Sequence, residues 1–155
     1  MCLSCDISIG TMIDMMTRSE NMANIRNKDT LPELKIRQAL RLARIGYRKN
    51  VKTLPGTPDI VCSRYKTAIF INGCFWHRHE GCKYATTPKT RQDYWTEKFR
   101  RNIERDIENK EDLTSLGWNV VVVWECEVRS RTTEDLSQYF TVLLNTNNRM
   151  AEQGD

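Results

Sequence analysis

The hydrophobic residues near the start of the chain follow a helical spacing. An apolar stripe at steps of three and four is formed by Ile36, Ala39, Leu40 and Ala43. This spacing predicts an amphipathic helix with one face turned to a core. Residues 30–33 match a capping box, with Pro32 in the first turn, so the helix should begin there. Gly46 stands where a C-terminal cap is expected, and the helix should therefore end near Ile45.

Short apolar runs farther along the chain predict strands. Residues 59–62 and 66–71 are two such runs joined by a polar turn at 63–65, a pattern typical of a hairpin. The second of these runs and a later one at 118–124 are apolar on both faces, which indicates buried strands. A further short strand is predicted at residues 47–51.

The longest helical pattern fills residues 92–116, is closed by Gly117 and separates the last two predicted strands. A strand, a helix and a strand in this order indicate a crossover connection. A last helix is predicted at residues 133–144. Together these elements predict a three-layer α/β fold with a central mixed sheet.

Length and composition fit one domain, since 39% of the 155 residues are hydrophobic. We predict a flexible arm at residues 1–18, a domain at 19–145 and a polar tail at 146–155. The formal net charge of +4 permits a polyanionic partner without demanding one. No apolar run approaches the roughly 18 residues needed to cross a bilayer, so we expect a cytoplasmic protein without a membrane partner.

A metal-ligand pattern lies in residues 74–82, which hold two cysteines and both histidines of the chain. Zinc prefers four tetrahedral ligands of this type, and Cys74, His79 and Cys82 supply three from one loop. Cys126 is the best candidate for the fourth, because it follows a strand that should lie in the same sheet as the strand before the loop. The alternative is that these thiols are small core residues and the histidines are surface residues.

Pro58 and Asp59, at the start of a predicted strand, resemble the first half of the PD-(D/E)XK nuclease pattern. The usual second half, an acid and a lysine after the next strand, is replaced by Ile71, Asn72 and Gly73. A more specific resemblance rests on Pro-Gly-Thr-Pro-Asp at 55–59, Phe-Ile-Asn-Gly-Cys-Phe-Trp-His at 70–77 and Trp-Glu-Cys at 124–126. These motifs look like the very-short-patch-repair (Vsr) endonuclease family, and the resemblance extends in order over roughly residues 17–130.

The resemblance implies a restriction-endonuclease-like fold with a magnesium site. Asp59 would bind Mg²⁺ through its carboxylate and Ile71 through its backbone carbonyl, in keeping with the preference of Mg²⁺ for oxygen ligands. His77 would be the general base, because an imidazole can accept a proton near neutral pH. Glu33 and Asp106 would lie near the metal and hold its water ligands.

Ordinary structural roles are alternatives for two of these acids. Glu33 also completes the capping box, and Asp106 could pair with Arg101 or Arg105 on a solvated helix. Family members often carry histidine where this chain has Asn72, a departure that concerns the outer metal shell only.

Phe75 and Trp76 are hard to explain as core residues beside a surface metal loop, and they look like a wedge for DNA. Aromatic insertion unstacks base pairs, and a mismatched step is easier to open. The resemblance adds Trp95 as a third intercalating side chain and Met22 as one that enters from the opposite groove.

On the predicted long helix, Trp95, Lys98, Asn102 and Asp106 recur at steps of three and four and should share one face. Lys98 and Asn102 offer hydrogen-bonding groups suited to base edges, and the resemblance implies that they read the mismatch. The alternative is a solvated helix with a buried tryptophan.

We therefore predict a bacterial, monomeric, Mg²⁺-dependent endonuclease with structural Zn²⁺. It should nick one strand of double-stranded DNA beside a T:G mismatch, leave a 5′-phosphate and start very short patch repair, with downstream repair proteins as further partners. One alternative is a restriction-like nuclease without mismatch dependence. The other is a zinc-stabilised DNA-binding module without catalysis, which would give Asp59 and His77 no task.

Overall fold

The computed structural model describes residues 28–152, so Met22 and the predicted N-terminal arm lie outside the described residues. The helices are α2 (Leu31–Leu42), η1 (Ser63–Tyr65, a 3-10 turn), α3 (Gln92–Ser115), α4 (Glu125–Ser130) and α5 (Thr133–Glu152). The strands are β1 (Arg48–Lys49), β2 (Ile60–Cys62), β3 (Thr67–Asn72) and β4 (Asn119–Trp124).

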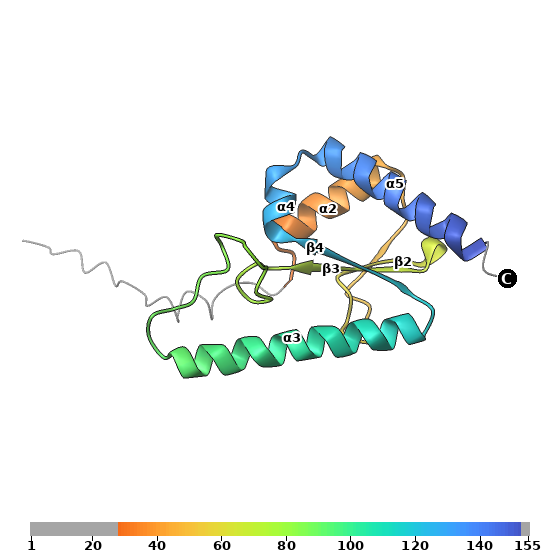
Figure 1. Ribbon diagram of the computed structural model, residues 1–155. Coiled ribbons are helices and arrows are strands. Elements are labelled where there is room, and N and C mark those ends of the chain that lie inside the picture. Colours follow the sequence, from red (N-terminus) through yellow and green to blue (C-terminus); the bar gives the residue numbers. More distant parts are fainter. Residues whose placement is uncertain (1–27, 153–155) are drawn as a thin grey trace, which may run out of the picture.

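The four strands form one mixed sheet in the order β1-β2-β3-β4. β1, β2 and β3 pair antiparallel, whereas β3 and β4 run parallel, with Ile71 opposite Val123 and Asn72 opposite Trp124. Helix α3 makes the crossover that a parallel pair requires. Figure 1 shows α2, α4 and α5 over one face of the sheet and α3 along the other. The predicted three-layer arrangement and mixed sheet are therefore confirmed.

The two faces of the sheet are packed differently. On the α2 and α5 side, a continuous core includes Ile36, Ile69 and Phe140, all fully buried. On the α3 side, Val122 of β4 keeps 38% of its surface exposed and Ile107 of α3 keeps 52%. The prediction that β4 is buried on both faces is therefore wrong, because α3 stands away from the middle of the sheet.

The ends of α2 and α3 follow the same capping geometry with different residues. Ile45 N donates to Leu40 O at 2.9 Å, and Arg44 takes the left-handed conformation with φ 56°. Gly46 was expected in that position, so the predicted cap and the predicted end near Ile45 are wrong. Gly117 closes α3 as predicted, with φ 78°.

The other differences concern element lengths. β1 is shorter than the predicted strand at 47–51, and α5 extends beyond its predicted end at residue 144 to Glu152. The short helix α4 was not predicted. It begins directly after β4 and carries Cys126 in its first turn, so it fixes where that thiol points.

Candidate active site and metal centre

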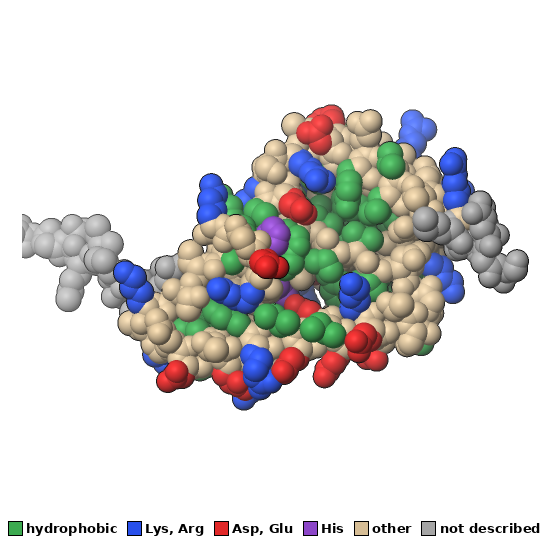
Figure 2. Space-filling view, viewed as in Figure 1, with side chains coloured by type: hydrophobic (Ala, Val, Ile, Leu, Met, Phe, Trp, Pro, Cys, Tyr) green, Lys and Arg blue, Asp and Glu red, His purple; other side chains and the backbone are tan. Residues whose placement is uncertain are grey.

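A cleft of about 1180 Å³ opens between α3 and the sheet. Its walls include Glu33 from α2, Asp59 from the loop before β2, Ile71 at the end of β3, His77 from the following loop and Asp106 from α3. Figure 2 shows histidine and acidic side chains beside the hollow on this face. The structure thus brings all five predicted catalytic and magnesium-binding residues to one cleft.

Asp59 is held against the end of β3. Its Oδ2 accepts a hydrogen bond from the Ile71 backbone N–H at 2.8 Å. Burial raises the pKa of Asp59 to about 6 and the negative charge of Glu33 adds to the shift, while the Ile71 hydrogen bond and His77 oppose it. A buried carboxylate beside a second carboxylate favours a bound cation, so this donor set fits a hard metal ion.

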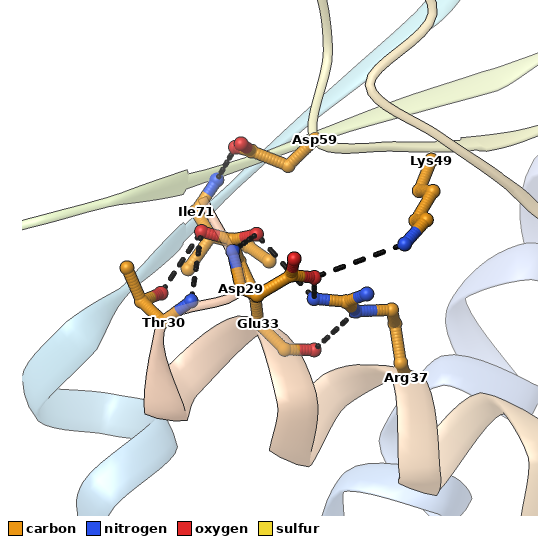
Figure 3. A network of polar contacts seen from close by, with 7 residues as sticks. All are labelled: Asp29, Thr30, Glu33, Arg37, Lys49, Asp59 and Ile71. Carbon is orange, nitrogen blue, oxygen red and sulfur yellow. Dashed lines mark hydrogen bonds and ion pairs between the residues drawn. The ribbon is translucent and has the colours of Figure 1, made fainter. Parts of the chain in front are cut away.

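Glu33 is 6% exposed and its carboxylate is fixed at both oxygens (Figure 3). Oε1 accepts a hydrogen bond from the Thr30 hydroxyl at 2.9 Å, and Oε2 accepts one from the Asp29 backbone N–H at 3.0 Å. The capping box predicted for this residue is confirmed. The same side chain lines the cleft beside Asp59, so capping does not remove Glu33 from the site.

Asp106 contacts the ring of His77 rather than an arginine. Its Oδ2 lies at hydrogen-bond distance from His77 Nδ1. Arg101 pairs instead with Glu97 at 2.8 Å, and Arg105 donates to Asn102 Oδ1 at 3.3 Å. The alternative that Asp106 pairs with one of these arginines is therefore wrong. Because a carboxylate accepts the Nδ1 proton, the neutral ring presents a lone pair at Nε2.

The four predicted zinc ligands converge. The ligand atoms of Cys74, His79, Cys82 and Cys126 all lie within 4.8 Å of one another. His79 Nδ1 is 3.3 Å from Cys126 Sγ and 3.7 Å from Cys74 Sγ. This clustering is what a small tetrahedral site requires, and a Cys3His donor set suits zinc. This convergence favours a metal site over the alternative of unrelated core thiols and surface histidines.

Local structure prepares this cluster. The His79 ring stacks on Trp124 at 4.2 Å between ring centroids, which fixes the direction of its nitrogens. Burial raises the pKa of Cys74 to about 12, so this thiol stays protonated unless a cation stabilises its thiolate. Trp124 was missed as a site residue because an aromatic side chain at a strand end looks like an ordinary core residue.

Phe75, Trp76, Trp95 and Phe99 form a compact aromatic cluster at the N-terminal part of α3. Phe75 is 9% and Trp95 is 5% exposed, and the Phe75 centroid is 5.5 Å from Trp95 and 5.3 Å from Phe99. The expectation that Phe75 could not be a core residue is wrong for the DNA-free chain, because Phe99 gives the loop a small core of its own. Phe99 stands four residues after Trp95, and this helical spacing is the signal by which the sequence could have revealed the packing, although it was missed.

The predicted common face of α3 is confirmed, and it contacts the loop after β3. Asn102 Nδ2 donates to the Trp76 backbone carbonyl at 3.2 Å, and Lys98 Nζ lies 4.9 Å from the centre of the Trp76 ring. Further along the same face Asp106 contacts His77. One helix face therefore holds both the aromatic and the catalytic part of this loop.

Within the described part of the chain, every helix is too short or too polar to cross a membrane.

Known proteins similar to this chain identify its protein class and its family. The family model described as DNA mismatch endonuclease Vsr matches residues 11–83. The Type II nicking enzyme V.NmeAIP of Neisseria meningitidis serogroup A is 45% identical over 123 residues, which are 77% of this chain and 87% of the relative. The DNA mismatch endonuclease Vsr of Escherichia coli K12 is 42% identical over 118 residues, 76% of this chain and 75% of the relative.

The type II nicking enzyme V.XorIIP of Xanthomonas oryzae is 43% identical over 107 residues, 69% of this chain and 78% of that protein. These relatives establish a DNA endonuclease. The chain belongs to the Vsr DNA mismatch endonuclease family, as its motifs predicted.

Proposed function

We propose that this endonuclease nicks one strand of duplex DNA beside a T:G mismatch, depends on Mg²⁺ and starts very short patch repair. The observation that carries the proposal is that one cleft holds two pairs of residues. In one pair the Asp59 carboxylate lies beside Glu33, and in the other the His77 ring is held by Asp106. The name of the Escherichia coli relative supports a mismatch substrate, and the names of the other two support a single-strand cut.

Asp59 and the backbone carbonyl of Ile71 would hold the magnesium ion. The raised pKa of Asp59 supports this assignment, because its charge is poorly stabilised by the protein alone. When bound, Mg²⁺ supplies neutralisation of the charge that develops on the scissile phosphate. Glu33, fixed by its capping contacts, would orient water around the ion.

His77 would act as the general base. Nε2 accepts a proton from the attacking water, the water oxygen forms a bond to phosphorus, and the bond from phosphorus to the 3′-oxygen breaks. The 3′-oxygen leaves with the electron pair of that bond and takes a proton from solvent water, so the products are a 3′-hydroxyl and a 5′-phosphate. Asp106 stabilises the imidazolium that forms, because its carboxylate already contacts Nδ1.

Zinc would have a structural task. Bound by Cys74, His79, Cys82 and Cys126, it would join the loop after β3 to the start of α4. His77 lies between two of these ligands in sequence, so the same bond network would restrain the base. The mixed sheet, with Asp59 just before β2 and in contact with the end of β3, supports a restriction-endonuclease-like fold. The proposed domain keeps the bounds 19–145 between an arm at 1–18 and a polar tail at 146–155, of which residues 146–152 belong to α5.

The aromatic cluster would recognise the mismatch. Phe75 and Trp76 sit on the loop that carries His77 and pack against Trp95 of α3, so a base step opened by these rings would lie near the site of cleavage. Met22 would enter from the opposite groove. Lys98 and Asn102, which already contact Trp76, would reach the displaced base edges of the T:G pair.

His77→Ala tests the mechanism on a T:G duplex. We expect Mg²⁺-dependent nicking to be lost while DNA affinity and zinc content stay at the wild-type level. Arg78→Ala, one residue away on the same loop, is the matched control for disturbance of the loop. Near-normal nicking by His77→Ala would exclude His77 as the base.

A further inference from the structure

Arg37 is a buried cation that the mechanism above does not use. It lies one helical turn after Glu33 on α2 and is 6% exposed. Its Nε donates to the Glu33 backbone carbonyl at 3.3 Å, and Nη2 donates to Asp29 Oδ1 at 2.5 Å. Nη2 also lies 3.6 Å from Glu33 Oε2. A buried guanidinium is costly unless carboxylates compensate it, so this placement calls for an explanation.

Figure 3 shows what these contacts do to Glu33. Thr30 approaches one carboxylate oxygen, Oε1, while the Asp29 backbone N–H and the Arg37 guanidinium both approach the other, Oε2. Asp59 lies nearby with its own carboxylate against the Ile71 N–H. Arg37 therefore closes the set of contacts that keeps Glu33 in place beside Asp59.

The charges of this network balance without Asp59. Asp29 and Glu33 carry two negative charges, and Arg37 and Lys49 carry two positive ones, with Lys49 Nζ 3.9 Å from Asp29 Oδ1. The Asp59 charge is thus left for another cation. Without Arg37, the buried Glu33 carboxylate would lose its cationic partner next to a second carboxylate, and it would turn toward solvent.

We propose that Arg37 is a positioning residue of the nuclease site, which keeps the Glu33 carboxylate in place beside Asp59 and so sets the Mg²⁺ concentration that cleavage requires. The inference rests on the proposed Mg²⁺-dependent nuclease function. Arg37 itself would contact neither DNA nor the metal ion. Its effect on the Mg²⁺ requirement would pass entirely through Glu33.

The test measures nicking of a T:G duplex as a function of Mg²⁺ concentration. We expect Arg37→Met to raise the half-maximal Mg²⁺ concentration about 10-fold, the lower end of the effect of losing a side chain that supports a metal site from outside its ligands, with zinc content unchanged. Arg37→Lys keeps the positive charge but lacks the several nitrogens of the guanidinium, so it should raise the half-maximal Mg²⁺ concentration less than Arg37→Met does. Arg41→Met, on an exposed position one turn later, should behave as wild type.

A double-mutant cycle separates positioning from stability. If Arg37 acts through Glu33, adding Arg37→Met to Glu33→Gln leaves the Mg²⁺ requirement where Glu33→Gln alone puts it. Independent, multiplicative effects would overturn the inference, as would a lowered Tm with an unchanged Mg²⁺ requirement. Should Arg37→Met not fold, Arg37→Lys takes its place in the cycle, and an unchanged requirement for that variant would also overturn it.

The wild-type curve distinguishes the two proposals. Wild-type enzyme that cuts without regard to Mg²⁺ would refute the proposed function and this inference with it. Mg²⁺-dependent wild-type cleavage together with an unaffected Arg37→Met variant would refute the inference alone.

Discussion

His77 Nδ1 and Asp106 Oδ2 are in hydrogen-bond contact although the two residues are 29 positions apart in the chain. The contact ties the loop after β3 to the middle of α3, and it settles which ring nitrogen faces the protein. A base that is held in this way needs no movement before it can accept a proton at the other nitrogen.

Asp106→Asn should therefore slow nicking by about 100-fold, because an amide can donate to Nδ1 and favour the tautomer that has no lone pair at Nε2. DNA affinity should stay the same. The measurement is the single-turnover nicking rate on a T:G duplex, with Glu104→Gln, an exposed neighbour on α3, as control. A full rate in Asp106→Asn would show that the contact does not orient the base.

Asp59→Asn should abolish nicking and yet stabilise the metal-free protein at pH 8. The pKa of Asp59 is raised from 3.8 to about 6, so ionisation is disfavoured in the folded state. The loss of folding free energy caused by ionised Asp59 is absent below pH 4, develops as the pH rises to 6 and is complete above pH 6. Two pKa units correspond to about 3 kcal/mol at most, and relief of part of this should raise Tm by several degrees.

Thermal unfolding of both proteins at pH 4 and pH 8 in a chelator of Mg²⁺ measures this effect. The gap in Tm should be present at pH 8 and small at pH 4. Added Mg²⁺ should stabilise the wild type at pH 8 and leave Asp59→Asn unchanged, since ligand binding to the folded state raises stability. A less stable Asp59→Asn at pH 8 would contradict the buried, uncompensated charge.

Cys126→Ser should lower bound zinc and Tm together, because loss of one ligand opens a tetrahedral site. Nicking should fall as well, since His77 lies on the loop that the cluster restrains. Cys62→Ala is the matched control: Cys62 is a buried core thiol in β2, and its loss should lower Tm without loss of zinc. Wild-type zinc content in Cys126→Ser would remove Cys126 from the site.

Phe99→Ala should weaken mismatch selectivity. The substitution removes a ring that packs against Phe75 and Trp95, at a cost of about 3 kcal/mol, and leaves the aromatic cluster loose. We expect a lower ratio of T:G to T:A nicking, measured against Tyr139→Ala on the remote helix α5. An unchanged ratio in a folded, destabilised Phe99→Ala protein would show that the cluster does not select the mismatch.

The sequence predicted what depends on local patterns. The start of α2 follows from the capping box at Thr30 and Glu33. The clustering of the four predicted zinc ligands follows from residue type and from the parallel pairing of β3 with β4. The spacing of Asn102 and Asp106 correctly placed both on the face of α3 that meets the loop.

What depends on packing between elements was not predictable. Gly46 was the natural choice for the left-handed cap of α2, but burial of Ile45 against the core places Arg44 there instead. The exposed Val122 reflects how far α3 stands from the sheet, which no pattern within one segment encodes. The helical pattern does not mark Arg37 as a buried residue, because its carboxylate partner Asp29 precedes the helix.

The central claim, a Mg²⁺-dependent cut beside a T:G mismatch, is tested most directly with two end-labelled duplexes that differ only in one T:G or T:A pair. The purified protein is incubated with each duplex in Mg²⁺ and in chelator, and nicks are mapped on both strands. We expect one nick beside the mismatched T, with a 5′-phosphate, only in the T:G duplex and only with Mg²⁺. Equal cutting of both duplexes would contradict mismatch recognition, and tight binding without any cut would contradict catalysis by Asp59 and His77.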